Sequence, residues 1–341
     1  MAYRITLIPG DGIGPEITKA TARVLQHAGV EIEWDVQEAG VAALTKFHDP
    51  LPQSVIDSIA QNKVALKGPL TTPVGKGFRS VNVALRKEFE LYVNQRPAKT
   101  FKGIKTLYFD HIDLMIFREN LEEFYSGIEH YIDSSRSAAE TIGIITKRGS
   151  ERIIRYAFEY ARKHGRKKIT LVHKANILKY TGGLFLDVGS EIAKEYPDVK
   201  FDDKIVDNMA MQMVMNPYQF DVIVTTNLFG DILSDLASGL VGGLGLAPGA
   251  NIGDGAAIFE AVHGSAPDIA GLGVANPCAI LLASVMMLDY LGEAEAAKKI
   301  EAAIAKVIEE EKFVTKDINP VNPVSTVEMT DEIIRQLDKL G

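Results

Sequence analysis

Apolar and polar positions in the first part of the chain alternate between two periods. Residues 3–8 show the two-residue period of a strand, and residues 13–28 carry apolar side chains every three or four positions, as an amphipathic helix does. The same succession follows with a strand over 31–36, a helix over 53–60 and a short buried strand over 64–66. Strands that alternate with helices predict an α/β layered fold.

The strand patterns lie closer together in the middle of the chain. Residues 91–97, 104–109 and 114–119 each predict a strand, and the glycine-rich residues 239–255 predict a long loop or crossover. The other expected elements are strands over 168–173 and 221–225 and helices over 151–164, 228–240, 279–291 and 294–309. No repeat or low-complexity linker separates these elements, so we expect the two halves of the chain to share a sheet or to exchange strands.

The composition narrows the class of protein. The 341 residues include 37 Lys and Arg against 45 Asp and Glu, a formal net charge of −8, which argues against nonspecific nucleic-acid binding because that needs a basic face. The length suggests two domains, the longest mainly apolar run (278–288) is too short to span a membrane, and the single cysteine excludes a disulfide framework and a thiolate zinc site. Because the chain begins without an apolar signal segment, we expect a cytoplasmic protein with no nucleic-acid or membrane partner.

One segment departs from this acidic average. Residues 76–105 contain eight basic and two acidic side chains, which indicates either attraction of a small anion or an ordinary basic surface helix. Arginine presents a planar fork that fits a carboxylate with two hydrogen bonds. Converging arginines would select a di- or tricarboxylate, whereas separate ones would form surface ion pairs of little energetic value. The arginines beside apolar or aromatic residues are Arg79, Arg86, Arg96 and Arg118.

Asp231 and Asp235 lie four residues apart in a segment that is otherwise apolar. On a helix this spacing brings two carboxylates to one face, which is unfavourable unless a cation joins them. A hard divalent cation suits such oxygen ligands, and Asp207, at the end of a strand-like segment, is a possible third donor. The alternative is a solvated acidic helix face.

A glycine cluster over residues 10–14 follows the first strand and opens the first helix. This position invites the dinucleotide-binding fingerprint G-x-G-x-x-G, but Pro15 occupies the place of the third glycine. Proline is favourable at the first position of a helix. We therefore expect a tight strand-to-helix turn close to a ligand instead of a Rossmann phosphate loop.

Three further residues carry chemistry that their positions could use. Lys174 ends a predicted strand, where functional side chains of α/β sheets gather, and near a cation it could act as a base; the alternative is an ordinary strand-end lysine. Tyr125 is either a proton donor or a core aromatic residue. His263 lies in a loop punctuated by glycine and proline, whose small residues would let a planar ring or phosphates approach the backbone.

Together these motifs resemble the β-decarboxylating dehydrogenases, the isocitrate/isopropylmalate dehydrogenase family. The resemblance extends nearly from end to end, through LIPGDGIGPEI, GPLTTPVGKGFRSVNVALRKEFELYVNQRP, IFRENLEEFYSGIE, LVHKANILK, NLFGDILSD, GLAPGANIGD and HGSAPDIAGLGVANP. It implies that family's two-domain, non-Rossmann α/β fold, with mixed sheets and helices on their faces. We expect a large cofactor-binding domain over 1–98 and 250–341 and a small domain with dimer-forming elements over 99–249.

The resemblance also implies roles for the candidate residues. Tyr125 would be a general acid, and Lys174 would act in proton transfer at the partner subunit's site of a homodimer. Mg²⁺ or Mn²⁺ would bind Asp231 and Asp235, with Asp207 contributed by the partner subunit. The expected substrate-binding residues are Ser80, Asn82, Arg86, Arg96 and Arg118. The expected cofactor-binding residues are Thr72, Glu260, His263, Gly264, Ser265, Ala266, Asp268, Ile269 and Asn276.

Within the family, the chain is most similar to NAD-dependent isocitrate dehydrogenases. Ser80 and Asn82 can hydrogen-bond a γ-carboxylate where isopropylmalate enzymes have an apolar pocket. Asp268 and Ile269 replace the Lys-Tyr pair of NADP-dependent relatives, and a carboxylate accepts from a ribose 2′-OH but repels a 2′-phosphate; the alternative role of Asp268 is a helix N-cap. The resemblance thus implies conversion of isocitrate to 2-oxoglutarate and CO₂.

Other members of the family remain alternatives. The first is homoisocitrate dehydrogenase, because its substrate is one methylene longer and one methylene is worth only about 1–3 kcal/mol of discrimination. The second is 3-isopropylmalate dehydrogenase. A regulatory subunit without catalysis should have lost catalytic residues, and all of them are present in this sequence.

Overall fold

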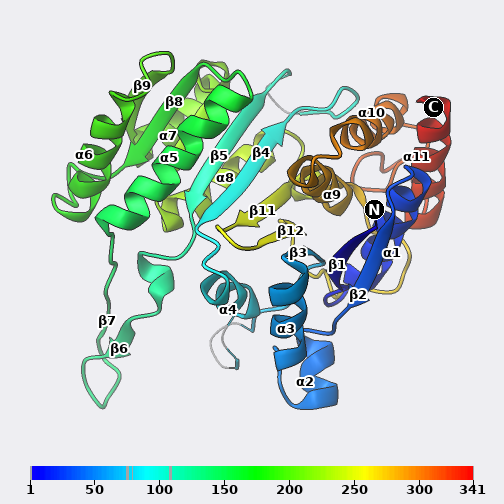
Figure 1. Ribbon diagram of the computed structural model, residues 1–341, viewed down its shortest axis with the longest axis horizontal. Coiled ribbons are helices and arrows are strands. Elements are labelled where there is room, and N and C mark those ends of the chain that lie inside the picture. Colours follow the sequence, from blue (N-terminus) through cyan, green and yellow to red (C-terminus); the bar gives the residue numbers. More distant parts are fainter. Residues whose placement is uncertain (1, 74–76, 79, 107–109, 341) are drawn as a thin grey trace.

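The computed structural model describes residues 2–73, 77–78, 80–106 and 110–340. A ten-stranded sheet with the order β2-β1-β3-β12-β11-β4-β5-β10-β8-β9 runs through the molecule (Figure 1). Its strands are β1 (Tyr3–Ile8), β2 (Ile32–Val36), β3 (Val64–Lys67), β4 (Val93–Lys99), β5 (Asp113–Glu119), β8 (Lys168–His173), β9 (Lys200–Ile205), β10 (Val222–Thr225), β11 (Pro248–Ile252) and β12 (Ala257–Ala261).

The sheet is mixed. The central pairs β12–β11, β11–β4 and β4–β5 are antiparallel, and the pairs on both sides of them are parallel. Both boundaries of the expected domains fall inside strands, at residues 98/99 in β4 and 249/250 in β11. This continuity confirms that the two halves share a sheet, and the division into two domains stays a prediction.

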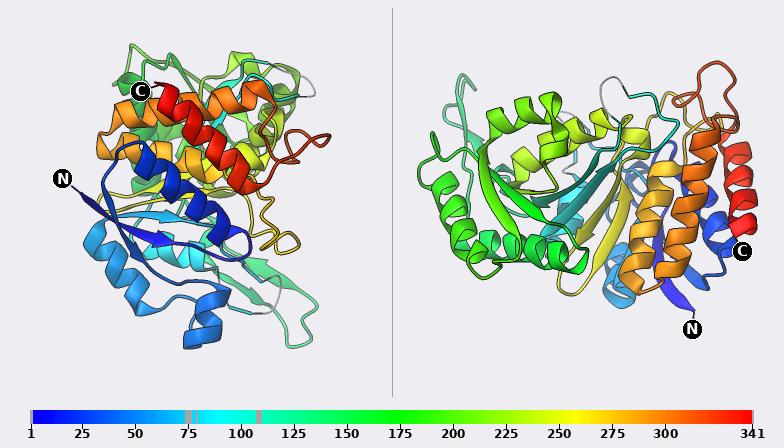
Figure 2. Two further views of the ribbon diagram at one scale, coloured as in Figure 1. Left: turned by 90° about the vertical axis from the view of Figure 1, so that its right-hand side faces the viewer. Right: turned by 90° about the horizontal axis from the view of Figure 1, so that it is seen from above.

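Helices cover both faces of the sheet (Figure 2). Strand β5 shows the alternation that separates the faces, because Met115 and Phe117 join one apolar core while Leu114 and Ile116 join another. The helices that pack in the first core are α1 (Gly14–His27), α5 (Lys147–Lys163), α6 (Thr181–Ala193), α9 (Cys278–Leu291), α10 (Ala294–Glu310) and α11 (Thr326–Leu340). The opposite face carries α3 (Gln53–Asn62) and α4 (Val81–Glu88) at one end and α7 (Val206–Met215) and α8 (Asn227–Leu240) at the other.

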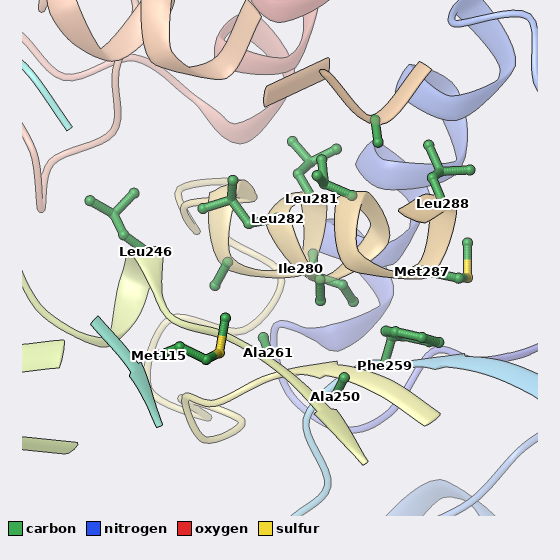
Figure 3. Packing of buried hydrophobic residues seen from close by; sticks show 14 of the residues in the cluster. Met115, Leu246, Ala250, Phe259, Ala261, Ile280, Leu281, Leu282, Met287 and Leu288 are labelled. Atoms are coloured by element: carbon green, nitrogen blue, oxygen red, sulfur yellow. The ribbon is translucent and has the colours of Figure 1, made fainter. Parts of the chain in front are cut away.

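The first core is centred on α9, which is apolar on nearly all sides, as expected for a helix enclosed by other elements. In Figure 3 the side chain of Ile280 lies between α9 and the strands that carry Ala250 and Phe259, and Leu281 lies on the opposite side of this helix. Two smaller elements complete the fold, α2 (Val41–Phe47) and the hairpin β6 (Glu129–Tyr131) and β7 (Ala139–Thr141), which follows the short helix η1 (Phe124–Ser126). No helix among the described residues is long and apolar enough to cross a membrane.

Two expected elements differ from the structure. Residues 104–106 do not form a strand, because the Ile104 and Thr106 amides donate to carbonyls two or three residues earlier and fold the backbone into turns; residues 107–109 lie outside the described part. Residues 239–255 are not one long loop, since β11 occupies 248–252 and pairs with both β12 and β4. The glycine and proline of this segment indicated a loop, although the segment forms a strand whose residues are all buried.

Candidate active site

One face of the sheet carries a row of buried polar side chains across five neighbouring strands. The register pairs Lys67 of β3 with Glu260 of β12, and it pairs Asn94 of β4 with both Asn251 of β11 and Arg118 of β5. All five point toward the face of α4 and α8, because the residues next to them in the chain belong to the apolar core of the opposite face. The row lies between the two apolar clusters of this face.

Hydrogen bonds join four of these five side chains. Lys67 Nζ is 2.6 Å from Glu260 Oε2, Asn251 Nδ2 donates to Glu260 Oε1 over 2.7 Å, and Asn94 Nδ2 donates to Asn251 Oδ1 over 2.9 Å. Burial alone would raise the pKa of Glu260, but Lys67 and Arg86 lower it to about 2. Glu260, a predicted cofactor ligand, therefore has partners for both of its carboxylate oxygens within the chain.

Three of the predicted arginines converge beside this row. Arg86, Arg96 and Arg118 come from α4, β4 and β5, and their exposed fractions are 9%, 9% and 1%. Arg96 Nε donates to Asn94 Oδ1 over 2.8 Å, and Arg118 Nε and Nη2 donate to Asn227 Oδ1 over 3.0 and 2.8 Å. Burial and the charge of Arg86 lower the pKa of Arg96 and lower that of Arg118 to about 10. These three are thus a buried cationic cluster and not separate surface ion pairs.

The carboxylates of α8 face the same cluster. Asp231 pairs through Oδ1 with Arg118, and its Oδ2 accepts from the Tyr125 hydroxyl over 2.6 Å. Asp235 Oδ1 lies 3.7 Å from Arg96 Nη1. Burial opposes ionisation of Asp231, yet Arg118 holds its pKa below the usual value, whereas burial raises the pKa of Asp235. The pair is therefore part of the site and not merely a solvated helix face.

The α8 carboxylates supply part of a shell for a divalent cation. Their side chains are 41% and 55% exposed, so two oxygen-bearing groups one helical turn apart remain accessible. In the described part of the chain, no three His, Cys, Asp or Glu side chains are close enough to hold a metal ion. Asp207 lies in the first turn of α7 instead of ending a strand, and it pairs with Lys174. A full coordination shell would need further oxygen atoms from substrate, water or another chain. The prediction that the partner's Asp207 is a metal ligand assigns one of them to another chain.

Tyr125 and Lys174 lie in different settings. Tyr125 belongs to η1, its ring centroid is 4.8 Å from the Arg118 guanidinium carbon, and its hydroxyl contacts Asp231. Burial raises its pKa, and the bond to Asp231 adds to this effect. Tyr125 therefore contacts the arginine and carboxylate cluster and is not simply a core aromatic residue, and its role as a proton donor stays a prediction. Lys174 follows β8 and pairs with Asp207 across the turn into α7.

Helix α4 presents polar atoms that still need partners. Ser80 is its N-cap: the Oγ atom accepts from the amide three residues later over 3.4 Å and from Thr72 Oγ1 over 3.3 Å. One turn apart on the same helix, Asn82 Oδ1 and Arg86 Nε are buried without a hydrogen-bond partner in the described part of the chain. An unpaired buried polar atom costs about 1–3 kcal/mol, so a polar ligand here would relieve that cost. Arg79 lies outside the described residues, as does Lys76.

The glycine cluster forms the predicted tight turn between β1 and α1. Gly12 has φ +57°, and a Cβ atom there would come within 1.9 Å of the Ser265 carbonyl oxygen. The Ile13 amide donates to that oxygen over 2.9 Å, and the Thr71 and Ser265 hydroxyl oxygens are 2.8 Å apart. The glycines therefore let the turn pack against the predicted cofactor loop, and they do not form a Rossmann phosphate loop.

The rest of that loop is irregular. His263 Nδ1 donates to the Gly264 carbonyl over 2.9 Å, and burial lowers the pKa of this histidine. Asp268 is exposed in a turn closed by the Ile269 amide and the Ala266 carbonyl. The next helix is α9, which begins at residue 278, so the N-cap role of Asp268 is wrong.

Asn276 ends the loop with both ends of its amide in use. Its Nδ2 donates to Asp317 over 2.8 Å, and its Oδ1 accepts from the Cys278 amide over 2.9 Å. These bonds anchor the loop to the start of α9. The predicted contact of Asn276 with a cofactor would add to this anchoring or replace it.

Glu119 is a site neighbour that the sequence pattern did not reveal. It follows Arg118 on β5, is 3% exposed, and accepts from the backbone amides of Leu121 and Glu122 at the start of the segment that leads to Tyr125. Burial raises its pKa to about 7 despite these bonds. Between about pH 4.5 and pH 7, Glu119 is therefore protonated in the folded protein and ionised in the unfolded chain.

This shift predicts a pH-dependent stability. An acid whose pKa is raised on folding favours the folded state at low pH, and this contribution is lost as pH rises toward the folded-state pKa. We expect Glu119→Gln to gain up to about 3 kcal/mol in unfolding free energy relative to the parent between pH 4.5 and pH 8, at 1.36 kcal/mol per pKa unit. Urea unfolding of both proteins across this range measures the difference, and a constant difference would contradict the assignment.

The remaining residues missed from the sequence are Lys67, Asn94, Asn227 and Asn251. Lys67 and Asn251 alternate with core residues on their strands, and this alternation is the signal that could have found them, because a polar side chain on a buried sheet face needs a partner there. Asn94 is followed by Gln95 and Arg96, and Asn227 begins α8 after two threonines, so their local sequences gave no such signal.

Comparison with known proteins identifies the family. A family model described as "Isocitrate/isopropylmalate dehydrogenase" matches residues 4–333. The crystal structure of isocitrate dehydrogenase from Methylococcus capsulatus superposes with a TM-score of 0.96 at 58% identity, covering 98% of this chain and 99% of that chain.

Three curated relatives carry different names at similar identity. The probable NAD isocitrate dehydrogenase subunit alpha, mitochondrial, of Drosophila melanogaster is 48% identical over 98% of this chain and 87% of its own length. An isocitrate dehydrogenase [NADP] of Thermus thermophilus is 50% identical over 98% of this chain and 68% of its own length. A chloroplastic 3-isopropylmalate dehydrogenase of Solanum tuberosum is 49% identical over 89% of this chain and 85% of its own length. A family match over nearly the whole chain, together with identities near one half, shows that the chain belongs to the isocitrate/isopropylmalate dehydrogenase family.

Proposed function

We propose that this enzyme converts isocitrate to 2-oxoglutarate and CO₂ with NAD as the hydride acceptor. The observation that carries this proposal is the convergence of three buried arginines beside two carboxylates of α8. Three buried guanidinium groups repel one another, and a substrate with several carboxylates would relieve that repulsion. The paired acids would bind a divalent cation next to the same anion.

The chain's residues then divide the work of the reaction. Arg86, Arg96 and Arg118 orient the carboxylates of the substrate, which brings the C2 hydrogen toward the nicotinamide. Lys174 of the partner subunit takes the proton of the C2 hydroxyl, and Tyr125 donates a proton to carbon after CO₂ has left. A cation held by Asp231, Asp235 and the partner's Asp207 would supply Lewis-acid stabilisation of the negative charge that develops on oxygen.

The choice of isocitrate rests on α4. Arg86 Nε is a buried donor without a partner in the described part of the chain, and the Asn82 amide group and the Ser80 hydroxyl of the same helix can donate beside it. Such polar groups suit a third carboxylate better than an isopropyl group. The names of several relatives near 48% identity, NAD isocitrate dehydrogenases, support the same choice. The alternatives are homoisocitrate and 3-isopropylmalate; the second is the substrate in the name of the potato relative.

The deciding experiment is a comparison of kcat/KM for isocitrate, homoisocitrate and 3-isopropylmalate, each with NAD and with NADP. We expect isocitrate with NAD to give the highest value in the presence of Mg²⁺ or Mn²⁺. A higher value for either alternative substrate would replace the proposed reaction by that of the corresponding family member.

The preference for NAD is proposed from Asp268, whose exposed carboxylate lies in the loop that contacts the β1–α1 turn. We expect Asp268→Lys combined with Ile269→Tyr to raise the ratio of kcat/KM with NADP to that with NAD at least about 100-fold. The reason is that a like-charge contact with a 2′-phosphate, which costs several kcal/mol, is replaced by an attractive one. Steady-state kinetics with both cofactors measure the ratio.

The exposed loop residue Asp254 offers the matched control. Asp254→Lys adds the same charge elsewhere and should leave the cofactor ratio unchanged. If the double variant also kept the parent ratio, residues 268 and 269 would not determine the choice between NAD and NADP.

A homodimer with shared sites is proposed from exposed apolar side chains. The hairpin β6–β7, which extends away from the sheet in Figure 1, carries Tyr131, Ile132 and Ile142 at 55%, 62% and 47% exposure. Met215 of α7 and Ile232 of α8 are 70% and 57% exposed. An isolated two-stranded hairpin is marginally stable in water, so a second copy covering these surfaces would stabilise it. The cytoplasmic location stays a prediction, since similar relatives are named as mitochondrial.

A further inference from the structure

The backbone that carries Lys174 is held from one side by a buried histidine. His173 is the last residue of β8, and its side chain is 5% exposed. Its Nδ1 atom accepts a hydrogen bond from the Ala175 amide over 3.0 Å. The ring of His173 therefore spans Lys174 and binds the backbone on its far side.

The same ring contacts a carboxylate through its other nitrogen. His173 Nε2 lies 3.0 Å from Oδ2 of Asp203 on the neighbouring strand β9. Because Nδ1 accepts the Ala175 amide hydrogen, it carries no proton, so Nε2 holds the ring proton and donates it to Asp203. Asp203 thus selects the tautomer that leaves Nδ1 free to accept.

The turn after β8 is fixed from its other side as well. The Lys174 carbonyl accepts from the Ile177 and Leu178 amides over 3.0 and 2.8 Å. A Cβ atom at Gly182 of α6 would lie 3.0 Å from the Ala175 nitrogen, which shows how closely α6 approaches this turn.

Packing alone does not hold the turn, because a cavity of about 250 Å³ borders both His173 and Lys174. The cavity continues to Thr226 and Phe229 near the start of α8. Hydrogen bonds to the backbone are therefore the directional restraints on the path of Lys174 beside this open space.

We propose that His173 and Asp203 are positioning residues, which hold the Lys174 turn so that Lys174 Nζ lies where proton transfer needs it. This inference rests on the proposed function, because Lys174 is assigned its proton-transfer role there. Neither residue contacts substrate: Asp203 sets the tautomer of His173, and His173 sets the position of the Ala175 amide and with it the direction of the Lys174 side chain. A misplacement of about 1 Å at such a group is enough to lower a rate substantially.

Two substitutions at one position separate the hydrogen bond from the volume of the ring. His173→Phe keeps an aromatic ring and removes the acceptor, whereas His173→Asn places an amide oxygen where Nδ1 was. We expect His173→Phe to lower kcat about tenfold, to change KM less than about twofold, and to speed hydrogen exchange of the Ala175 amide about tenfold. We expect His173→Asn to stay within about threefold of the parent in both kcat and exchange.

His164→Phe is the matched control, because His164 stacks on Tyr160 of α5 and should leave kcat and Ala175 exchange unchanged. The thermal midpoint of each variant is measured to confirm folding. Parent-like kcat and exchange in His173→Phe would overturn the proposal, as would a His173→Asn variant as impaired as His173→Phe, since the ring volume would then be what matters. If the parent protein does not oxidise isocitrate, the proposed function fails, and the exchange data alone still decide whether His173 holds the turn.

Discussion

Asp231→Asn is expected to lower kcat/KM for isocitrate at least about 10³-fold. Asp231 contacts Arg118 and Tyr125 and is one of two α8 carboxylates available to a divalent cation. Removing its charge weakens the cation site, and Lewis-acid stabilisation is worth several kcal/mol, at 1.36 kcal/mol for each tenfold change in rate. Kinetics over a range of Mn²⁺ concentrations, together with direct Mn²⁺ titration, measure the two losses. Asp187→Asn, on an exposed position of α6, is the control.

The same variant tests whether active sites are shared. Lys174→Ala should also be nearly inactive, and a mixture of the two inactive homodimers, dissociated and reassembled at equal amounts, should recover about a quarter of the parent activity. Only a mixed dimer contains a site with an intact Asp231 from one chain and an intact Lys174 from the other. No recovery in reassembled mixed dimers would mean that Lys174 serves the site of its own chain.

Arg118→Lys is expected to lower kcat/KM for isocitrate about 10²- to 10³-fold. Arg118 is 1% exposed and uses one fork to donate twice to Asn227 and once to Asp231. Lysine keeps the charge but cannot reproduce the planar fork. Losing two charge-assisted hydrogen bonds, each worth about 1.5–2 kcal/mol, accounts for this magnitude.

Ligand-induced stabilisation gives a second measurement for Arg118. Isocitrate should raise the thermal midpoint of the parent protein, since binding to the folded state stabilises it, and should raise that of Arg118→Lys much less. Arg155→Lys, in an exposed ion pair with Glu195, serves as the control and should keep both the activity and the shift in midpoint. An equal shift in parent and Arg118→Lys would mean that Arg118 does not bind the substrate.

Much of the site was predictable because its chemistry lies in short motifs. The spacing of Asp231 and Asp235 indicated two carboxylates on one helical face, and α8 places them so. The failure of the glycine cluster at Pro15 excluded a Rossmann loop, and the turn indeed packs on Ser265. By contrast, the glycine and proline of β11 predicted a loop, because only the pairing of this segment with β4 and β12 makes it a strand.

The sequence by itself determined the α/β class, many of the strands and helices, the family and the residue types available for chemistry, because these depend on local periodicity and contiguous motifs. The tertiary structure decided that Arg86, Arg96 and Arg118 converge, that Lys67, Glu260, Asn251 and Asn94 form one polar row beside them, and that Asp207 pairs with Lys174 away from the α8 carboxylates. Neighbouring strands of the sheet are distant in sequence, and their register follows from the packing of whole layers. Local patterns therefore name the functional groups, and the register of the sheet sets which of them meet.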